Sequence, residues 1–358
     1  MTDQPTIDIE AYLGEESKKI NATIESLIPH TIDQQWLEKT FGKPSYGYDV
    51  ESIQKGVVDP MWDLLDRGGK RWRPALFLLS LEAVGGDVQK YYHYTALPEI
   101  IHNGTLVADD VEDSSDLRRG KPCVHKIYGV DVAVNLSSAM YFFPFAMIWR
   151  DASLSPEVKN KLSELITFEL LRCHAGQGLD IWWHKGKKYA ISEAEYLQMC
   201  AYKTGTLARL SARMGGVLGK GTEEQVDALG RFAETIGVAF QIQDDILNLV
   251  GEEFSKGKGV GEDIHEGKRT IMVLHTLKNG NEADTKRLLE ILNSHPTDET
   301  IIREAIGIIT KNGSIEYARA KAKELVEGSW KTVDTTLPPS RAKEILEAFA
   351  HYLINRKV

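Results

Sequence analysis

The sequence predicts an all-α fold. Alternation of apolar and polar residues, which marks a half-buried strand, is scarce, whereas apolar residues recur with helical periodicity over long stretches. One such stretch is defined by Val158, Leu162, Leu165, Ile166, Leu170 and Leu171. The chain has 358 residues, of which 42% are hydrophobic, and this is enough for one large helical domain.

The expected elements divide the chain at residue 50. Residues 1–50 are predicted to form an accessory segment of one or two helices with a loop of Pro, Gly and Tyr at 42–47, and residues 51–358 to form the catalytic domain. Two long helices are expected around acidic clusters at 109–113 and 244–248, because their neighbours are apolar and poor in Gly and Pro. The tail from residue 298 alternates apolar and charged residues at helical spacing, which predicts packing helices.

The two acidic clusters predict a metal site. Their aspartates are Asp109, Asp110 and Asp113 in the first cluster and Asp244 and Asp245 in the second. Because residues four apart share a helix face, Asp109 and Asp113 can hold the same cations, and Asp244 offers the same arrangement from a second helix. Carboxylates in apolar surroundings need opposite charge, and no Lys or Arg lies beside these at helical spacing, so a metal is expected to supply it. Oxygen ligands without His or Cys favour Mg²⁺.

Basic residues accompany both clusters in five groups. In Gly68-Gly69-Lys70-Arg71-Trp72-Arg73-Pro74, Lys70 and Arg73 lie one helical turn apart after a glycine pair that lets the backbone approach a ligand. The other groups are Arg118-Arg119-Gly120-Lys121-Pro122, Lys203-Thr204, Lys258 and Lys268. Arg suits bidentate binding of oxyanions and Lys adds a mobile charge. Acidic clusters followed by such bases predict an enzyme that binds diphosphate substrates with the help of a metal ion.

In chain order, six segments resemble the successive motifs of trans-isoprenyl diphosphate synthases, and among these the geranylgeranyl diphosphate synthases in particular. The segments are GGKRWRP, HNGTLVADDVEDSSDLRRGKP, HAGQGLDIWW, YKTG, FQIQDDILNL and GKGVGEDIHEGK. The resemblance runs from about Asp59 to Thr276. It implies a single-domain isoprenoid synthase helical bundle with a central cavity, acting as a homodimer. The implied reaction condenses isopentenyl diphosphate head to tail with a dimethylallyl, geranyl or farnesyl diphosphate, with geranylgeranyl diphosphate as main product.

The resemblance also implies roles for individual residues. Those expected to bind isopentenyl diphosphate are Lys70, Arg73, His102 and Arg119. Those expected to grip the allylic diphosphate are Arg118, Lys203, Thr204, Gln241, Lys258 and Lys268. The magnesium ligands are expected to be Asp109, Asp113 and Asp244, with Asp110 and Asp245 in support. Gln241, Thr204 and the carbonyl of Lys203 are expected to face the allylic carbocation, so these three residues and the three principal aspartates form the predicted catalytic set. Asn248 replaces the third acid of the second motif, so metal ligation there is in doubt.

Product length is expected to depend on residues beneath the first cluster. Gly104 and Thr105 lie about one helical turn before Asp109 and are small, whereas shorter-product relatives are similar but carry bulky aromatics there. The resemblance implies that Tyr141 and Phe142, with His174 on a neighbouring helix, form a deeper floor. Farnesyl and geranylfarnesyl diphosphate are the alternative products. A second interpretation of the aromatic pair is ordinary packing in the core or at a dimer interface.

Two other classes of protein are less well supported. A non-catalytic regulatory subunit should have lost one acidic cluster or one basic motif, and the chain retains all of them. A terpene cyclase of the aspartate-rich type should carry a different second metal motif and lack Lys70, Arg73 and Arg119.

Composition limits the partners and the location. The formal net charge of −9 argues against a nucleic-acid partner, because nonspecific binding depends on neutralising phosphates. Three cysteines with no CxxC spacing indicate neither disulfides nor a zinc site, so a cytoplasmic location is expected. The N-terminus is polar and acidic, unlike a secretory signal. The longest apolar run, at 140–149, is too short to span a bilayer and contains proline, so no membrane span is expected.

Overall fold

The computed structural model describes residues 7–186, 188, 190–250 and 261–355. Helices dominate these residues, and the two short strands found in them form one antiparallel hairpin. The all-α prediction is therefore confirmed. The chain forms two compact units, the first from Met1–Ile166 and Met214–Lys220 and the second from Thr167–Arg213 and Gly221–Val358. Two helices, α10 (Pro156–His184) and α12 (Thr206–Leu218), contribute residues to both units.

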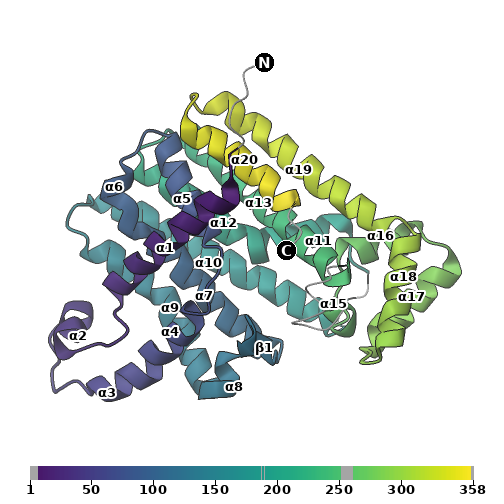
Figure 1. Ribbon diagram of the computed structural model, residues 1–358, viewed down its shortest axis with the longest axis horizontal. Coiled ribbons are helices and arrows are strands. Elements are labelled where there is room, and N and C mark those ends of the chain that lie inside the picture. The colour runs from purple at the N-terminus through teal and green to yellow at the C-terminus, as the bar shows by residue number, and fades with distance from the viewer. Residues whose placement is uncertain (1–6, 187, 189, 251–260, 356–358) are drawn as a thin grey trace. The chain divides into compact units, whose positions relative to one another are not determined.

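The first unit is built mainly from the N-terminal helices (Figure 1, purple to blue). Its further elements are α1 (Ile9–Leu27), α2 (Gln34–Phe41), α3 (Val50–Ile53), the π-helical turn η1 (Gln54–Val58), α4 (Asp59–Leu65), α5 (Trp72–Ala83), α6 (Val88–Tyr91), the 3₁₀ turn η2 (Tyr92–Thr95), α7 (Ala96–Glu112), β1 (Leu117–Arg118), β2 (Lys121–Pro122), α8 (Val124–Tyr128) and α9 (Val130–Arg150).

The core of the first unit includes the N-terminal helices. Buried side chains of α1 and α2, such as Ile20, Ile24 and Leu37, share one apolar cluster with Trp62 of α4 and Ile100 of α7. The N-terminal segment thus consists of helices and a loop at 42–47, as predicted, and it packs within the same compact unit as α4, α7 and α9. Whether residue 50 is a domain boundary stays a prediction.

Helix α9 packs along α7 in the first unit. It is 21 residues long and carries Pro144 in its interior, so it extends well beyond the apolar run at 140–149. Among the described helices, it is the one with the length and composition to cross a membrane, with a mean hydropathy of 1.4, and 33% of that window is buried in the protein. A core helix of a soluble protein passes the same test, so this finding alone is weak evidence for a span.

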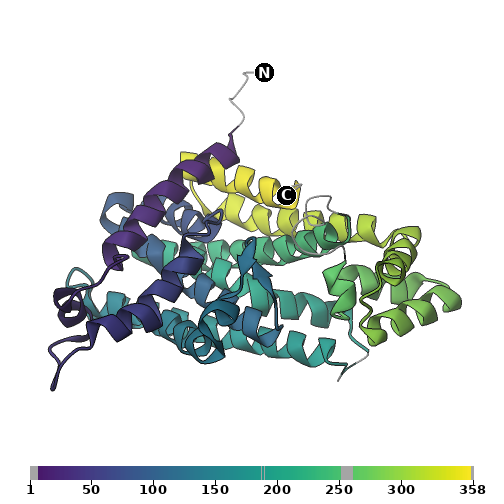
Figure 2. The same cartoon turned by 60° about the horizontal axis from the view of Figure 1, so that its bottom comes forward.

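The second unit contains the long C-terminal helices (Figure 1, green to yellow). Its further elements are α11 (Glu193–Cys200), the π-helical turn η3 (Ala201–Gly205), α13 (Glu223–Val250), α15 (Glu262–His265), α16 (Ile271–Asn279), α17 (Glu282–Ser294), α18 (Glu299–Lys311), α19 (Ser314–Thr336) and α20 (Arg341–Asn355). Helix α19 runs along α13, and α17 lies beside α18 (Figures 1 and 2). The tail is therefore helical and packs on the rest of its unit, as its periodicity predicts.

Candidate active site

The first acidic cluster lies in the last turn of α7. Asp113 ends the helix, and its backbone N–H donates to the carbonyl of Asp109 at 2.9 Å. The side chain of Asp109 is 23% exposed, whereas that of Asp110 is 1% exposed. The C-terminal end of a helix carries partial negative charge, and this last turn contains no basic residue. Acidic side chains at such an end favour a bound cation.

Arg118 supplies part of that positive charge. It lies on β1 of the hairpin that follows α7, and its guanidinium donates to Asp110 Oδ1 from Nε at 2.8 Å and also from Nη2. Nη2 lies 3.3 Å from Asp109 Oδ2 as well. The first cluster therefore has a basic partner, although no Lys or Arg lies beside it at helical spacing. Helical spacing does not reveal this partner, because the chain reverses directly after α7, where Ser114 has positive φ and the backbone N–H of Ser115 donates to the carbonyl of Asp110.

The cluster also offers oxygen atoms that could bind a metal. Asp110 Oδ2 is buried and has no hydrogen-bond partner among the described residues. Asp109 and Asp113 are partly exposed on the same side of the helix end. No three His, Cys, Asp or Glu side chains of the described residues are grouped closely enough to hold an ion by themselves. Mg²⁺ commonly takes one or two protein carboxylates and completes its shell with water and phosphate oxygens, so the donors fit it.

The predicted isopentenyl diphosphate residues converge in the first unit. Burial lowers the pKa of His102, and the positive charges of Arg73, Arg119, Arg71 and Arg118 lower it further. Burial also lowers the pKa of Arg119 to about 10; Glu99 opposes this, and neighbouring guanidinium groups add to it. Arg73 is buried and stacks on Trp72, with its guanidinium carbon 4.3 Å from the ring centroid, and Lys70 is exposed on the preceding loop. A neutral histidine among several guanidinium groups suits an anionic ligand.

The second unit contains a small cavity of about 40 Å³. It is lined by Asp180, Trp183, Tyr196, Met199, Lys203, Gln241, Asp245, Lys268, Arg269 and Thr270. Lys203 projects from the π-helical turn η3, and such turns often occur at functional sites. Gly176 of α10 lets this turn approach, because a Cβ at that position would lie 2.3 Å from the backbone nitrogen of Lys203.

Hydrogen bonds connect the polar residues around this cavity. The Thr204 hydroxyl donates to Gln241 Oε1 at 2.7 Å, and Gln241 Nε2 donates to Asp245 Oδ1 at 2.9 Å. The Tyr196 hydroxyl donates to the other oxygen of Asp245 at 2.6 Å. Lys203 Nζ lies 2.6 Å from Asp180 Oδ2. Thr204 and Gln241 are thus bonded to each other, while Tyr196 fixes Asp245, the partner of Gln241, and Asp180 pairs with Lys203.

Burial shapes the charge state of these groups. It raises the pKa of Asp245 to about 7, with a further increase from Asp263, against the hydrogen bonds from Tyr196 and Gln241. Burial would also raise the pKa of Asp180, yet Lys203 and Lys268 lower it overall. Lys268 Nζ lies 3.3 Å from Asp263 and 2.5 Å from Glu266. Burial would lower the pKa of Lys268, but Asp263, Glu266 and Asp180 raise it, so the lysine stays charged. An ionised Asp245 needs a cation nearby.

The remaining residues of the second cluster differ in exposure. Asp244 is partly exposed on α13. Asn248 is 8% exposed, and its side-chain oxygen accepts the backbone N–H of Asp263 at 3.1 Å, so it holds the start of α15. Lys258, predicted to grip the allylic diphosphate, lies outside the described residues.

The predicted chain-length residues are not equivalent. Gly104 is buried against α9, where an added Cβ would lie 2.9 Å from Met140 Cβ and 3.2 Å from Tyr141 Cε1. Thr105 is partly buried, and its hydroxyl donates to the carbonyl of His102 at 2.8 Å. Phe142, by contrast, is 70% exposed, and His174 is on the exposed side of α10. Of the predicted floor, Tyr141 is the member that lies beside Gly104, and the chain-length roles stay predictions.

Sequence reasoning missed five residues that hold the predicted ones in place. They are Arg71, Glu99 and Asn103 in the first unit and Asp180 and Tyr196 in the second. Arg71, Asn103 and Asp180 lie inside motifs quoted for the family resemblance, so the signal was present but without an assigned role. Glu99 could have been found as an acid inside an apolar helix; Tyr196 left no comparable signal.

Known proteins match almost the whole chain. The family model described as polyprenyl synthetase matches residues 54–309. A short chain isoprenyl diphosphate synthase of Methanothermobacter thermautotrophicus is 36% identical over 294 residues, which cover 82% of this chain and 88% of that protein. A geranylgeranyl diphosphate synthase of Saccharolobus solfataricus is 31% identical over 310 residues, which cover 86% of this chain and 92% of the relative.

A solved structure shows the same fold. The crystal structure of geranylgeranyl pyrophosphate synthetase from Pyrococcus horikoshii superposes with a TM-score of 0.83 at 34% sequence identity, covering 97% of this chain and 98% of that chain. The prediction of an isoprenoid synthase fold is confirmed by this likeness. Together with the family model and the relatives, it shows that the chain belongs to the polyprenyl synthetase family.

Proposed function

We propose that this protein is a trans-prenyltransferase that condenses isopentenyl diphosphate head to tail with an allylic diphosphate and releases diphosphate. The observation that carries the proposal is that each compact unit places aspartates near basic side chains. In the first unit the aspartates of α7 lie next to Arg118 and a group of guanidiniums around His102. In the second unit the aspartates of α13 lie near a cavity lined by Lys203 and Lys268. Both arrangements suit a diphosphate ester together with a cation.

Magnesium is the proposed cofactor. Asp109 and Asp113 would bind magnesium at the end of α7, with Asp110 in support, and Asp244 would bind it on α13, with Asp245 in support. When bound, Mg²⁺ supplies positive charge where the leaving diphosphate develops negative charge. The buried, unpaired Oδ2 of Asp110 and the raised pKa of Asp245 are the features of this chain that support the assignment.

The proposed reaction needs no strong protein base. The C–O bond of the allylic substrate breaks, with both electrons leaving on the diphosphate, and the double bond of isopentenyl diphosphate attacks the resulting carbocation. The proton then lost from the isopentenyl carbon goes to the departing diphosphate. Thr204 and Gln241 offer neutral dipoles, and their mutual hydrogen bond and the bond from Gln241 to Asp245 fix their orientation. Preorganised dipoles of this kind stabilise a cation without being alkylated by it.

Geranylgeranyl diphosphate is the proposed main product. Relatives that match most of the chain are named geranylgeranyl diphosphate synthases, and one from Natronomonas pharaonis, 33% identical, is named a geranylfarnesyl diphosphate synthase. Small residues at 104 and 105 support a product longer than farnesyl diphosphate. A homodimer, which the family resemblance implies, and a cytoplasmic location, which the cysteine pattern favours, belong to the same proposal.

A product assay tests this proposal. The purified protein is incubated with labelled isopentenyl diphosphate, Mg²⁺ and either dimethylallyl, geranyl or farnesyl diphosphate, and the dephosphorylated products are separated by chromatography. We expect a C20 alcohol as main product and no product after chelation of the metal. No elongation with any starter would identify a non-catalytic subunit, and a cyclic hydrocarbon from an allylic substrate alone would identify a terpene cyclase.

A further inference from the structure

Arg71 has no role in the proposed reaction, yet its side chain is buried and makes four hydrogen bonds. It donates to the carbonyls of Leu65 at 2.8 Å and Gly68 at 3.2 Å, to Glu99 Oε1 at 2.6 Å and to Asn21 Oδ1 at 2.9 Å. Its backbone is left-handed, with φ +48, a conformation that side chains of L residues rarely adopt. These bonds hold the loop between α4 and α5, which carries Lys70, in a strained shape.

The same network reaches Arg119. Glu99 is 2% exposed and accepts from Asn103 Nδ2 at 2.7 Å as well as from Arg71. Asn103 Oδ1 in turn accepts from Arg119 Nη1 at 3.4 Å. Gly69 lets the loop lie against both guanidiniums, because a Cβ there would be 3.1 Å from a nitrogen of each. The guanidinium groups of Arg71 and Arg119 and the loop that carries Lys70 are therefore held in place by one hydrogen-bond network.

Arg119 keeps its charge available within this network. Its hydrogen bonds go to the carbonyl of Leu64 at 3.3 Å and to the amide of Asn103. No carboxylate of the described residues forms an ion pair with it, whereas Arg67, Arg71 and Arg118 each have one. A guanidinium held by neutral oxygens is oriented without being neutralised, so it is prepared to bind a diphosphate.

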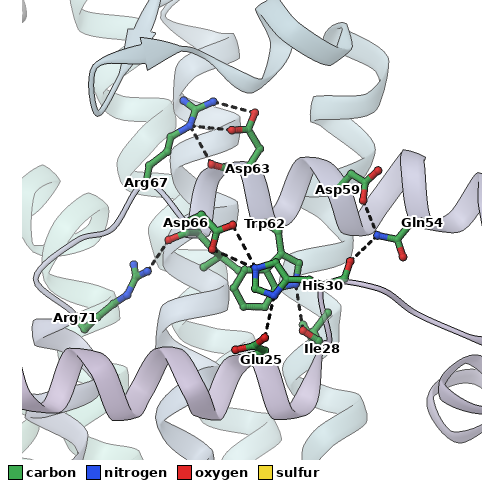
Figure 3. Close-up of polar contacts among 11 residues, drawn as sticks. Glu25, Ile28, His30, Gln54, Asp59, Trp62, Asp63, Asp66, Arg67 and Arg71 are labelled. Carbon is green, nitrogen blue, oxygen red and sulfur yellow. Dashed lines mark hydrogen bonds and ion pairs between the residues drawn. The ribbon is translucent and has the colours of Figure 1, made fainter.

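Helix α1 supplies the outer end of the network through Asn21. This helix lies before residue 54, where the family match begins. Its C-terminal end is fixed on α4 by two contacts (Figure 3). Trp62 Nε1 donates to the carbonyl of Ile28 at 3.1 Å, and the rings of His30 and Trp62 stack with their centroids 3.8 Å apart. His30 also contacts Asp66 at 3.3 Å and Glu25 at 3.2 Å. Asn21 thus offers its oxygen to Arg71 from a fixed position.

We propose that α1 is a working part of the isopentenyl diphosphate site. Asn21 is a positioning residue that fixes Arg71; Arg71, through Glu99 and Asn103, then fixes the guanidinium of Arg119 and the loop that carries Lys70. The inference rests on the proposed function, because Arg119 and Lys70 are assigned there to isopentenyl diphosphate. It gives the N-terminal helix a role in substrate binding in addition to its contribution to the core.

Steady-state kinetics with three variants tests this inference. Asn21→Ala removes the oxygen that accepts from Arg71, and Asn21→Asp keeps an oxygen there. Thr23→Ala is a matched control on the same helix, because the Thr23 hydroxyl donates to the carbonyl of Lys19 in its own helix. Loss of one hydrogen bond commonly changes an equilibrium constant by roughly 3- to 10-fold. We therefore expect Asn21→Ala to raise the KM for isopentenyl diphosphate by that factor, with kcat and the allylic KM changed by less than about twofold. Asn21→Asp and Thr23→Ala should resemble the wild type.

The outcomes separate this inference from the proposed function. If the wild type elongates an allylic starter and Asn21→Ala behaves like Thr23→Ala, the network does not position the site and the inference is wrong. Equal increases in both KM values, or a lower melting temperature with unchanged kinetics, would equally overturn it, because α1 would then act through stability alone. If the wild type shows no turnover with any starter, the proposed function fails and the inference fails with it.

Discussion

Replacing Gly104 by Ala tests whether α7 and α9 are packed as tightly as the structure shows. An Ala Cβ would lie 2.9 Å from Met140 Cβ, 3.2 Å from Tyr141 Cε1 and 3.3 Å from the carbonyl oxygen of Ser137. The nearest of these is a Cβ, which cannot move without its backbone. Adding a methyl group to such a contact costs about 1–3 kcal/mol. Ala is more favourable than Gly inside a helix by about 1 kcal/mol.

The net expectation is that Gly104→Ala lowers the free energy of unfolding by about 0–2 kcal/mol. Gly14→Ala is the matched control, because Gly14 also lies inside a helix of the first unit, α1, and a Cβ there would meet nothing within 4 Å. It should raise the free energy of unfolding by about 0.5–1 kcal/mol. Urea unfolding followed by circular dichroism measures both. If Gly104→Ala is as stable as Gly14→Ala, α9 moves away freely and the reasoning about this contact is wrong.

Four further outcomes are expected. Asp109→Ala and Asp244→Ala should each lower kcat by about 10²–10³ while the circular dichroism spectrum stays unchanged, since each removes charge that acts on the leaving group; near-normal turnover at saturating Mg²⁺ would remove these residues from the mechanism. Arg119→Ala should raise the KM for isopentenyl diphosphate more than the allylic KM, and the reverse pattern would exchange the two assignments. Tyr141→Ala should lengthen the product without help from the exposed Phe142, and an unchanged product would place the floor elsewhere. The three cysteines are all buried and burial raises the pKa of Cys123 to about 12, so iodoacetamide at pH 8 should label none of them in the native protein and all three in urea; rapid native labelling, detected by mass spectrometry, would contradict the structure.

The sequence alone determined the class of fold and the chemistry of the motifs. Helical periodicity predicts the helices because burial on one face repeats along the chain, and this local pattern survives in the structure as α7, α13 and the C-terminal helices. The carboxylates at 109 and 113 share a helix face for the same local reason. A metal site and diphosphate-binding bases could be predicted from residue type, since charge and ligand chemistry belong to side chains and not to a fold.

Only the tertiary structure decided which partner each of these groups binds. Arg118 returns to Asp110 because the chain reverses after α7 at Ser114, and Arg71 reaches Asn21, fifty residues earlier, because α1 packs beside α5. Asn248 holds α15, and Phe142 is exposed although its neighbour Tyr141 lies against Gly104. Such contacts depend on backbone reversals and on burial between distant segments. The local spacing of residues does not encode them, because the free energy of each contact is set by groups brought together only when the chain has folded.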